Sequence, residues 1–267
     1  MQGNITLGFY VPGQSFIHRL DPRTKILACL AMTMAVLFCN HPAGFAALSL
    51  VTLLALGLAR VTPQLLLGIL RPFWIFLVLA LLLQLLFTPG RPLMMLGPLQ
   101  LTREGVHFGF QLLWRLVLLI ISGSLLTLTT SPLMITAALE DLLKPLRRVG
   151  VPVFEVAMMM SIALRFVPTL LEEAQQIIRA QQSRGAAFFT GGRPVQRVQG
   201  LVTLLVPLFA SAFRRADELA TSMEIRCYRP GANRTRMHQL RFHCRDYAVL
   251  AGTGVLFLIV LVMRWWG

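Results

Sequence analysis

The sequence predicts an all-α, polytopic membrane protein with about five transmembrane helices and long amphipathic coupling helices on the cytoplasmic side. Of its 267 residues, 56% are hydrophobic and 13% are charged, so the chain is more apolar than an ordinary soluble domain. Five apolar runs, taken with their interfacial ends, reach the roughly twenty residues that a bilayer requires. Two further long segments combine apolar residues at three-four spacing with a polar face, which is typical of amphipathic helices.

The five apolar runs are the predicted spans. They cover residues 22–40, 42–60, 63–88, 105–130 and 246–265. The first begins at Asp21-Pro22, where the aspartate can accept free backbone amides and proline fits the first helical turn. The third begins in the same way at Thr62-Pro63. Basic residues favour the cytoplasmic side, so the basic stretch 18–25 places the N-terminus in the cytoplasm and five spans place the C-terminus outside.

The segment between the fourth and fifth spans carries most of the Arg and Lys residues. We therefore expect it to be cytoplasmic or interfacial. The predicted domains are a membrane domain over 1–130, a coupling-helix module over 131–245 and a C-terminal transmembrane helix over 246–267. Within the module, the pattern predicts helices over 132–148, 152–184 and 194–228.

The second and third helices of this module are built alike. Each is apolar in its first half and polar in its second half, and each contains a proline, Pro168 or Pro207, which should bend it. Hydropathy alone leaves open whether the apolar halves, near 150–171 and 198–213, enter the bilayer.

Both long helices end in an arginine. A cation in the last turn of a helix is stabilised by about 0.3–1 kcal/mol through the unpaired carbonyls, and Gly185 is an ordinary helix cap. The repetition favours a second reading, in which Arg184 and Arg226 enter acidic grooves of a partner and form bidentate pairs. Glu224 is expected to pair locally with arginine. The candidate docking residues are Ser183, Arg184, Gly185, Glu224, Arg226 and Cys227.

The motifs of several other protein classes are missing from the sequence. It contains no Walker-type phosphate loop, G-x-S-x-G or H-E-x-x-H, and no carboxylate cluster lies within the spans. We therefore expect no catalytic residue and no cofactor. The four cysteines are scattered without a CxxC pair, so no metal site is expected. Despite a net charge of +14, the basic residues cluster on helix ends, and nucleic-acid binding is not expected.

Three stretches of the chain resemble the transmembrane T component of energy-coupling factor transporters, a class of bacterial vitamin and metal-ion importers. They are His18-Arg19-Leu20-Asp21-Pro22-Arg23-Thr24-Lys25, Leu164-Arg165-Phe166-Val167-Pro168-Thr169-Leu170, and Arg215-Ala216-Asp217-Glu218-Leu219-Ala220 leading to Met223-Glu224-Ile225-Arg226-Cys227-Tyr228. In that family, two coupling helices end in Ala-Arg-Gly-like motifs whose arginines dock into a pair of ABC ATPases. The second motif here, Ile225-Arg226-Cys227, lacks both small flanking residues, so a tight glycine cap is not expected there.

The resemblance implies a non-catalytic scaffold subunit in the plasma membrane of a bacterium. Its implied partners are two ABC ATPase subunits and a substrate-binding S component, which together import a vitamin or a transition-metal ion. One alternative is the permease subunit of a conventional ABC transporter with its own substrate path, which should have a single short coupling-helix loop. Another is a membrane-bound enzyme or assembly factor, which should have a polar cluster in the spans, where Gln84 and Arg115 stand as isolated polar residues.

Overall fold

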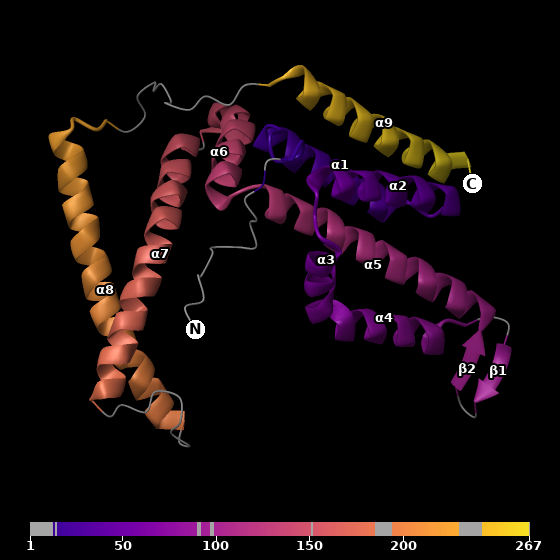
Figure 1. The fold of residues 1–267 in the computed structure, drawn as a ribbon, viewed down its shortest axis with the longest axis horizontal. Helices are drawn as coiled ribbons and strands as arrows, with labels where there is room; N and C mark the ends of the chain where they lie inside the picture. The colour runs from indigo at the N-terminus through magenta and orange to yellow at the C-terminus, as the bar shows by residue number, and fades with distance from the viewer. Residues whose placement is uncertain are drawn as a thin grey trace. The chain divides into compact units, whose positions relative to one another are not determined.

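The protein is described by a computed structural model, in which two compact units are distinguished (Figure 1). One, here called the bundle unit, comprises residues 8–138 and 239–267, and the other, here called the helix-pair unit, comprises residues 139–238 and 1–7. The structure describes residues 13, 15–89, 92–96, 99–150, 152–184, 194–229 and 242–266.

The described chain is predominantly α-helical, which confirms the predicted fold class. The bundle unit contains α1 (Pro22–Phe38), α2 (Pro42–Ala59), α3 (Pro63–Leu70), the 3-10 turn η1 (Arg71–Phe73), α4 (Trp74–Phe87), α5 (Arg103–Thr129) and α9 (Cys244–Trp266). The helix α6 (Pro132–Leu143) begins in the bundle unit and ends in the helix-pair unit, which continues with the 3-10 turn η2 (Lys144–Val149), α7 (Val153–Ser183) and α8 (Pro194–Ile225).

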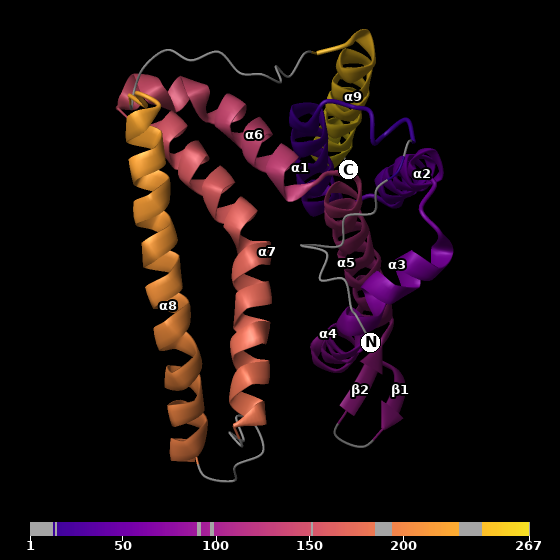
Figure 2. The ribbon, with the colours of Figure 1, turned by 60° about the vertical axis from the view of Figure 1, so that its left-hand side comes forward.

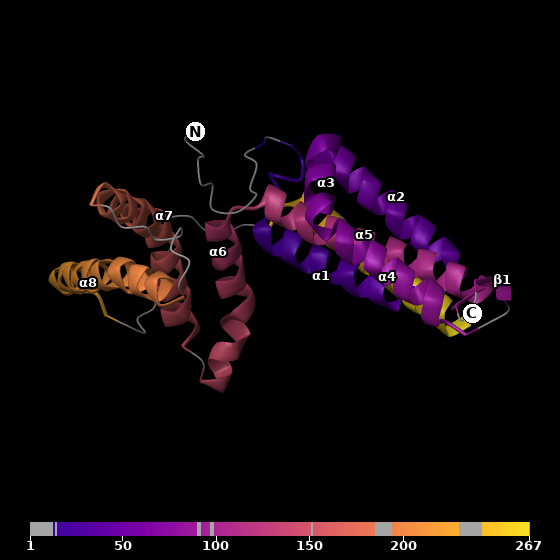
Figure 3. The same cartoon turned by 90° about the horizontal axis from the view of Figure 1, so that it is seen from below.

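Helix α1 is the centre of the bundle unit, because α9, α5 and α2 all pack against it. Figure 3 shows α1, α2 and α5 running along a common direction. The core is apolar and comes mainly from α1, with contributions from the other three helices. It consists of Met32, Ala35, Val36, Cys39, Phe45, Leu48, Leu118 and Val260. The first and last helices of the chain are therefore neighbours in space.

Large apolar side chains are exposed on helices of the bundle unit, as at Leu53 on α2, Leu67 on α3 and Ile75 on α4. Such broad apolar surface is unfavourable in water and suits contact with lipid. Among the residues that the structure describes, five helical stretches are long and apolar enough to cross a membrane by length and composition. They are Pro42–Ala59, Pro63–Phe87, Arg103–Thr129, Val153–Ser183 and Cys244–Trp265.

This set differs from the predicted spans at one helix. Predicted span 22–40 forms α1, which has only 17 residues and is about 26 Å long. Helix α7, which hydropathy left open, has 31 residues and an apolar first half, and it qualifies as a span instead.

Two prolines interrupt segments that the apolar pattern predicted as continuous helices. The run 63–88 is divided by η1 at Pro72, and the helix predicted over 132–148 changes to η2 near Pro145. Proline has no amide hydrogen, and its ring crowds the carbonyl of the preceding turn. The breaks therefore follow from local chemistry that the apolar periodicity does not register.

A short hairpin was not predicted. Strand β1 (Pro92–Leu96) pairs antiparallel with β2 (Leu99–Thr102), with Met94 opposite Leu101. The buried hydroxyl of Thr102 donates to the carbonyl of Thr88 at 2.8 Å and accepts from the amide of Gly105 at 3.1 Å. This one side chain thus joins the segment after α4 to the first turn of α5.

The two predicted helix starts have different outcomes. The Asp21 carboxylate accepts from the Arg23 amide at 2.9 Å, which confirms the expected cap of α1. Thr62 occupies the same position before α3, but its side chain makes no capping hydrogen bond there.

Candidate functional site

The two long helices of the helix-pair unit, α7 and α8, run antiparallel (Figure 2). In the second half of each helix, the Glu173 carboxylate on α7 lies 3.1 Å from the Arg215 guanidinium on α8. At the other contact, the Tyr228 hydroxyl donates to the sulfur of Met158 at 2.8 Å. Tyr228, which follows the end of α8, thus lies beside Met158 near the beginning of α7. The C-terminal ends of the two helices therefore point in opposite directions.

The end of α7 carries the first arginine. Arg184 is the C-cap of α7, and its amide donates to the Gln181 carbonyl at 3.1 Å. The hydroxyl of Ser183 donates to the Ala180 carbonyl at 2.8 Å, within the last turn. The side chain of Arg184 is exposed. Gly185 lies outside the described residues.

The end of α8 is closed by a tight cap that the sequence did not predict. The Cys227 amide donates to the Glu224 carbonyl at 2.8 Å, and the Tyr228 amide donates to the Met223 carbonyl at 3.0 Å. These two bonds are those of a Schellman motif, in which the residue after the C-cap is left-handed and is usually glycine. Here Cys227 has φ of 55°. A tight cap therefore forms without glycine, against the expectation from the flanking residues of Arg226.

This cap fixes the backbone beside Arg226, whose side chain is exposed. Glu224 contributes through its backbone carbonyl, and within the described part of the chain its carboxylate forms no ion pair with Arg226. Both candidate arginines thus end a helix with an exposed guanidinium, which presents five N–H donors in a fixed plane. A carboxylate-bearing partner can accept these donors bidentately.

The Glu173–Arg215 ion pair serves as the reference point for the positions of the two arginines. Arg184 and Arg226 each lie the same number of residues beyond the Glu173–Arg215 contact, in opposite directions. At a rise of 1.5 Å per residue, they are about 33 Å apart along the helix axes. A groove that accepts one arginine therefore cannot accept the other, and two separate sites are required on whatever binds them.

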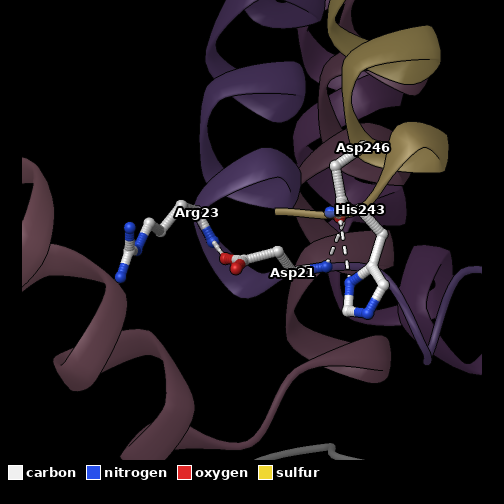
Figure 4. Close-up of polar contacts among 4 residues, drawn as sticks. All are labelled: Asp21, Arg23, His243 and Asp246. Atoms are coloured by element: carbon white, nitrogen blue, oxygen red, sulfur yellow. Dashed lines mark hydrogen bonds and ion pairs between the residues drawn. The ribbon is translucent and has the colours of Figure 1, made fainter. Parts of the chain in front are cut away.

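In the bundle unit, a buried carboxylate joins the first helix to the last (Figure 4). Asp246, in the first turn of α9, is 1% exposed. Its Oδ1 accepts from the Asp21 amide at 2.9 Å, and its Oδ2 accepts from the His243 amide at 2.8 Å. The residues that it connects are far apart in sequence, so the pattern of the sequence contained no signal for this contact.

Arg115 lies inside the apolar helix α5 and is accommodated by a neighbouring helix. Its Nη2 donates to the Cys39 carbonyl at 2.5 Å and to Oδ1 of Asn40 at 3.1 Å, directly after α1 ends. Its guanidinium also lies over the ring of Phe45, 5.7 Å from the centroid. A cation that is costly in hydrocarbon thus supplies hydrogen bonds to free acceptors at a helix end.

Among the residues that the structure describes, no group of three or more His, Cys, Asp and Glu side chains could hold a metal ion.

Sequence comparisons agree with this architecture. The profile of the cobalt transport protein family, CbiQ, matches residues 13–238. The energy-coupling factor transporter transmembrane protein EcfT of Thermosediminibacter oceani is 49% identical over 260 residues, covering 97% of this chain and 98% of that protein. Proteins of the same name from Acidaminococcus fermentans (47% identity, 99% and 98% coverage) and Heliobacterium modesticaldum (50% identity, 98% and 98% coverage) are similar over nearly their whole length.

Proposed function

Because this chain belongs to the family of energy-coupling factor transporter transmembrane proteins, we propose that α7 and α8 dock two ABC ATPase subunits through Arg184 and Arg226. The chain is the transmembrane T component of such a transporter and a multi-pass protein of the bacterial cell membrane. In the proposed mechanism, it has no catalytic residue of its own. It transmits ATP-driven movement of the ATPases to a substrate-binding S component, which then releases a vitamin or a transition-metal ion inside.

One observation carries this proposal: two exposed arginines end the oppositely directed helices of one antiparallel pair. Each guanidinium matches the geometry of a carboxylate. The docking set on α7 is Ser183, Arg184 and Gly185, and the set on α8 is Glu224, Arg226 and Cys227. The 31 and 32 residues of the two helices suit this arrangement better than a single short coupling loop.

The apolar parts of the same helices supply a second surface. Met159 and Met160 on α7 and Phe209 and Phe213 on α8 are exposed. Large exposed apolar side chains mark protein or membrane contacts. We assign this surface to the S component and the lipid around it. In the proposed division of the sequence, the coupling module 131–245 follows the membrane domain 1–130 and precedes the C-terminal helix 246–267.

The experiment is co-purification of the complete transporter, with the ATPases and an S component, for Arg184→Glu, Arg226→Glu and the double variant. Reversing one charge of a desolvated pair costs about 2–5 kcal/mol, or about 30-fold or more in affinity. Each single variant should therefore weaken retention of the ATPases, and the double variant should abolish both retention and uptake. Arg214→Glu is the matched control, because it makes the same change at an exposed position within α8.

Two outcomes would contradict the proposal. One is normal retention of the ATPases and normal uptake in the double variant. The other is an equal loss in Arg214→Glu, which would attribute the effect to net charge. Membrane insertion of every variant is checked first, since a chain that does not insert reports only on folding.

A further inference from the structure

The bundle unit has a half-open cavity of about 350 Å³ between α1, α2, α5 and α9. This volume lies within the range of small-molecule sites in proteins. Its walls are mostly apolar and include Ala28, Met32, Leu54 and Leu125. From Lys25 to Met32 along α1 the cavity extends about 10 Å.

The polar groups of the cavity leave one hydrogen-bond donor available. Lys25 is 7% exposed, and its Nζ donates to the carbonyls of His18 at 3.1 Å and Thr129 at 3.0 Å. An ammonium group has three donors, so one N–H has no acceptor among the described residues. The hydroxyls in the wall all donate to carbonyls of their own helices. They belong to Thr52, Ser122, Thr129 and Thr253.

A cation lies beside one of the residues that line the cavity. Phe16 lines the cavity and is 39% exposed. The guanidinium of Arg245 lies over its ring, 5.6 Å from the centroid, and the Arg245 side chain is exposed. A molecule in the cavity would thus have the Arg245 guanidinium near Phe16, one buried N–H donor at Lys25 and apolar walls along the rest of its length.

We propose that this cavity holds one acyl chain of an anionic bilayer phospholipid. The chain lies along Ala28 and Met32, its ester carbonyl accepts the remaining N–H of Lys25, and the phosphate lies beside Arg245. An ester carbonyl fits because it adds an acceptor and no charge, whereas the Asp21 and Asp246 carboxylates already lie near the Lys25 ammonium. A buried N–H without an acceptor is unfavourable. The lipid therefore completes a buried polar group as well as filling apolar space.

The test uses the complete transporter in vesicles of phosphatidylglycerol and phosphatidylcholine that contain phosphatidylglycerol with a diazirine in one acyl chain. After illumination, peptide mass spectrometry compares labelling of Met32, which is 8% exposed and lines the cavity, with Leu53, which is 65% exposed and does not. The proposal predicts labelling of both residues.

The key variant is Gly252→Leu. Gly252 lines the cavity, and a Cβ placed there meets nothing within 4 Å, so leucine fills the space without removing a polar contact. Gly254 has the same free space but does not line the cavity, so Gly254→Leu is the matched control. We expect Gly252→Leu to reduce labelling of Met32 by about tenfold. Labelling of Leu53 should stay unchanged, and Gly254→Leu should alter neither.

A second pair of variants tests whether Arg245 recognises the lipid headgroup. Arg245→Gln should remove the preference of the cavity for phosphatidylglycerol over phosphatidylcholine. Arg264→Gln should keep it, because Arg264 lies over Phe38, 5.1 Å from the centroid, and away from the cavity. Loss of the preference in both variants would overturn the role of Arg245.

Three results would contradict the assignment of a phospholipid as the occupant. If Met32 is unlabelled in the wild type, or equally labelled in Gly252→Leu, no acyl chain enters the cavity. If a free photoreactive fatty acid labels Met32 and the phospholipid does not, the ester is not recognised. If labelling occurs only in the isolated chain and disappears on assembly, the occupant is a partner protein.

Discussion

The carboxylate of Glu173 on α7 lies 3.1 Å from the guanidinium of Arg215 on α8. Glu173 is as many residues from Arg184 as Arg215 is from Arg226. The intervening stretches contain neither Pro168 nor Pro207, because both prolines come earlier in their helices. From the ion pair to each tip, the helix is therefore an uninterrupted rod. A change in the angle between the rods at this contact displaces both tips.

Reversing either charge of this pair should weaken the contact, and reversing both should restore it. An ion pair of this exposure contributes about 0–1 kcal/mol. Thermal unfolding of Glu173→Arg, Arg215→Glu and the double variant should thus give a favourable coupling energy of that size. In the parallel cycle with Arg214→Glu, the coupling energy should be near zero. Equal coupling energies in the two cycles would show that only net charge matters.

Cys227→Gly should stabilise the end of α8. The left-handed conformation at φ of 55° costs a residue with a Cβ about 1 kcal/mol, which glycine avoids. Hydrogen exchange of residues 220–228 should therefore become slower, and the melting temperature should rise slightly. Cys244→Gly is the control, because this exposed cysteine begins α9 without a positive φ and glycine there should destabilise the helix. Faster exchange at 220–228 in Cys227→Gly would contradict the assignment of the cap.

Asp246→Ala should destabilise the bundle unit strongly, because it leaves the amides of Asp21 and His243 without their acceptors. Each unsatisfied buried donor costs about 1–3 kcal/mol. Asp246→Asn keeps one acceptor oxygen and should lie between the wild type and the alanine variant in melting temperature. Asp217→Ala, at an exposed position on α8, should change it little. If Asp246→Ala melts like Asp217→Ala, the link between α1 and α9 is not stabilising.

Arg115→Met should destabilise the junction after α1 more than Asn40→Ala does. The methionine removes the donor to both the Cys39 carbonyl and the Asn40 side chain, whereas the alanine leaves the first of these bonds intact. We expect a loss of about 1–3 kcal/mol for Arg115→Met and a smaller loss for Asn40→Ala, measured by thermal unfolding in detergent. The reverse order would show that the cost of a cation in the apolar helix exceeds the value of its hydrogen bonds.

The sequence predicted those parts of the fold whose signal is local and repeated. The three-four spacing of apolar residues placed α7 over 152–184, and the structure has Val153–Ser183. The Asp21 cap was likewise visible, because an aspartate before a proline at a helix start acts within two residues. The third predicted span, 63–88, is a candidate span in the structure as Pro63–Phe87. Its 3-10 turn at Pro72 was not predicted, since an apolar count does not register the missing amide of proline.

Other features depend on contacts that no local pattern contains. The bonds from Asp246 to Asp21, and from Arg115 to the end of α1, join segments that meet only after the helices have packed. The cap at Cys227 was missed for a different reason. Glycine is the usual signal for a left-handed residue, and here the backbone hydrogen bonds hold a cysteine in that conformation. The position of the two arginines at helix ends was predictable, because they repeat after two similar apolar-to-polar stretches, and their docking role stays a prediction.

The antiparallel arrangement of α7 and α8 has a consequence for the symmetry of an assembly. Two rods that cross in opposite directions are exchanged by a twofold rotation about an axis through their contact, and here that axis passes beside Glu173 and Arg215. The same rotation exchanges Arg184 and Arg226, although the residues that flank them differ. A single asymmetric chain can thus meet a pair of like subunits related by a dyad with equivalent chemistry on both.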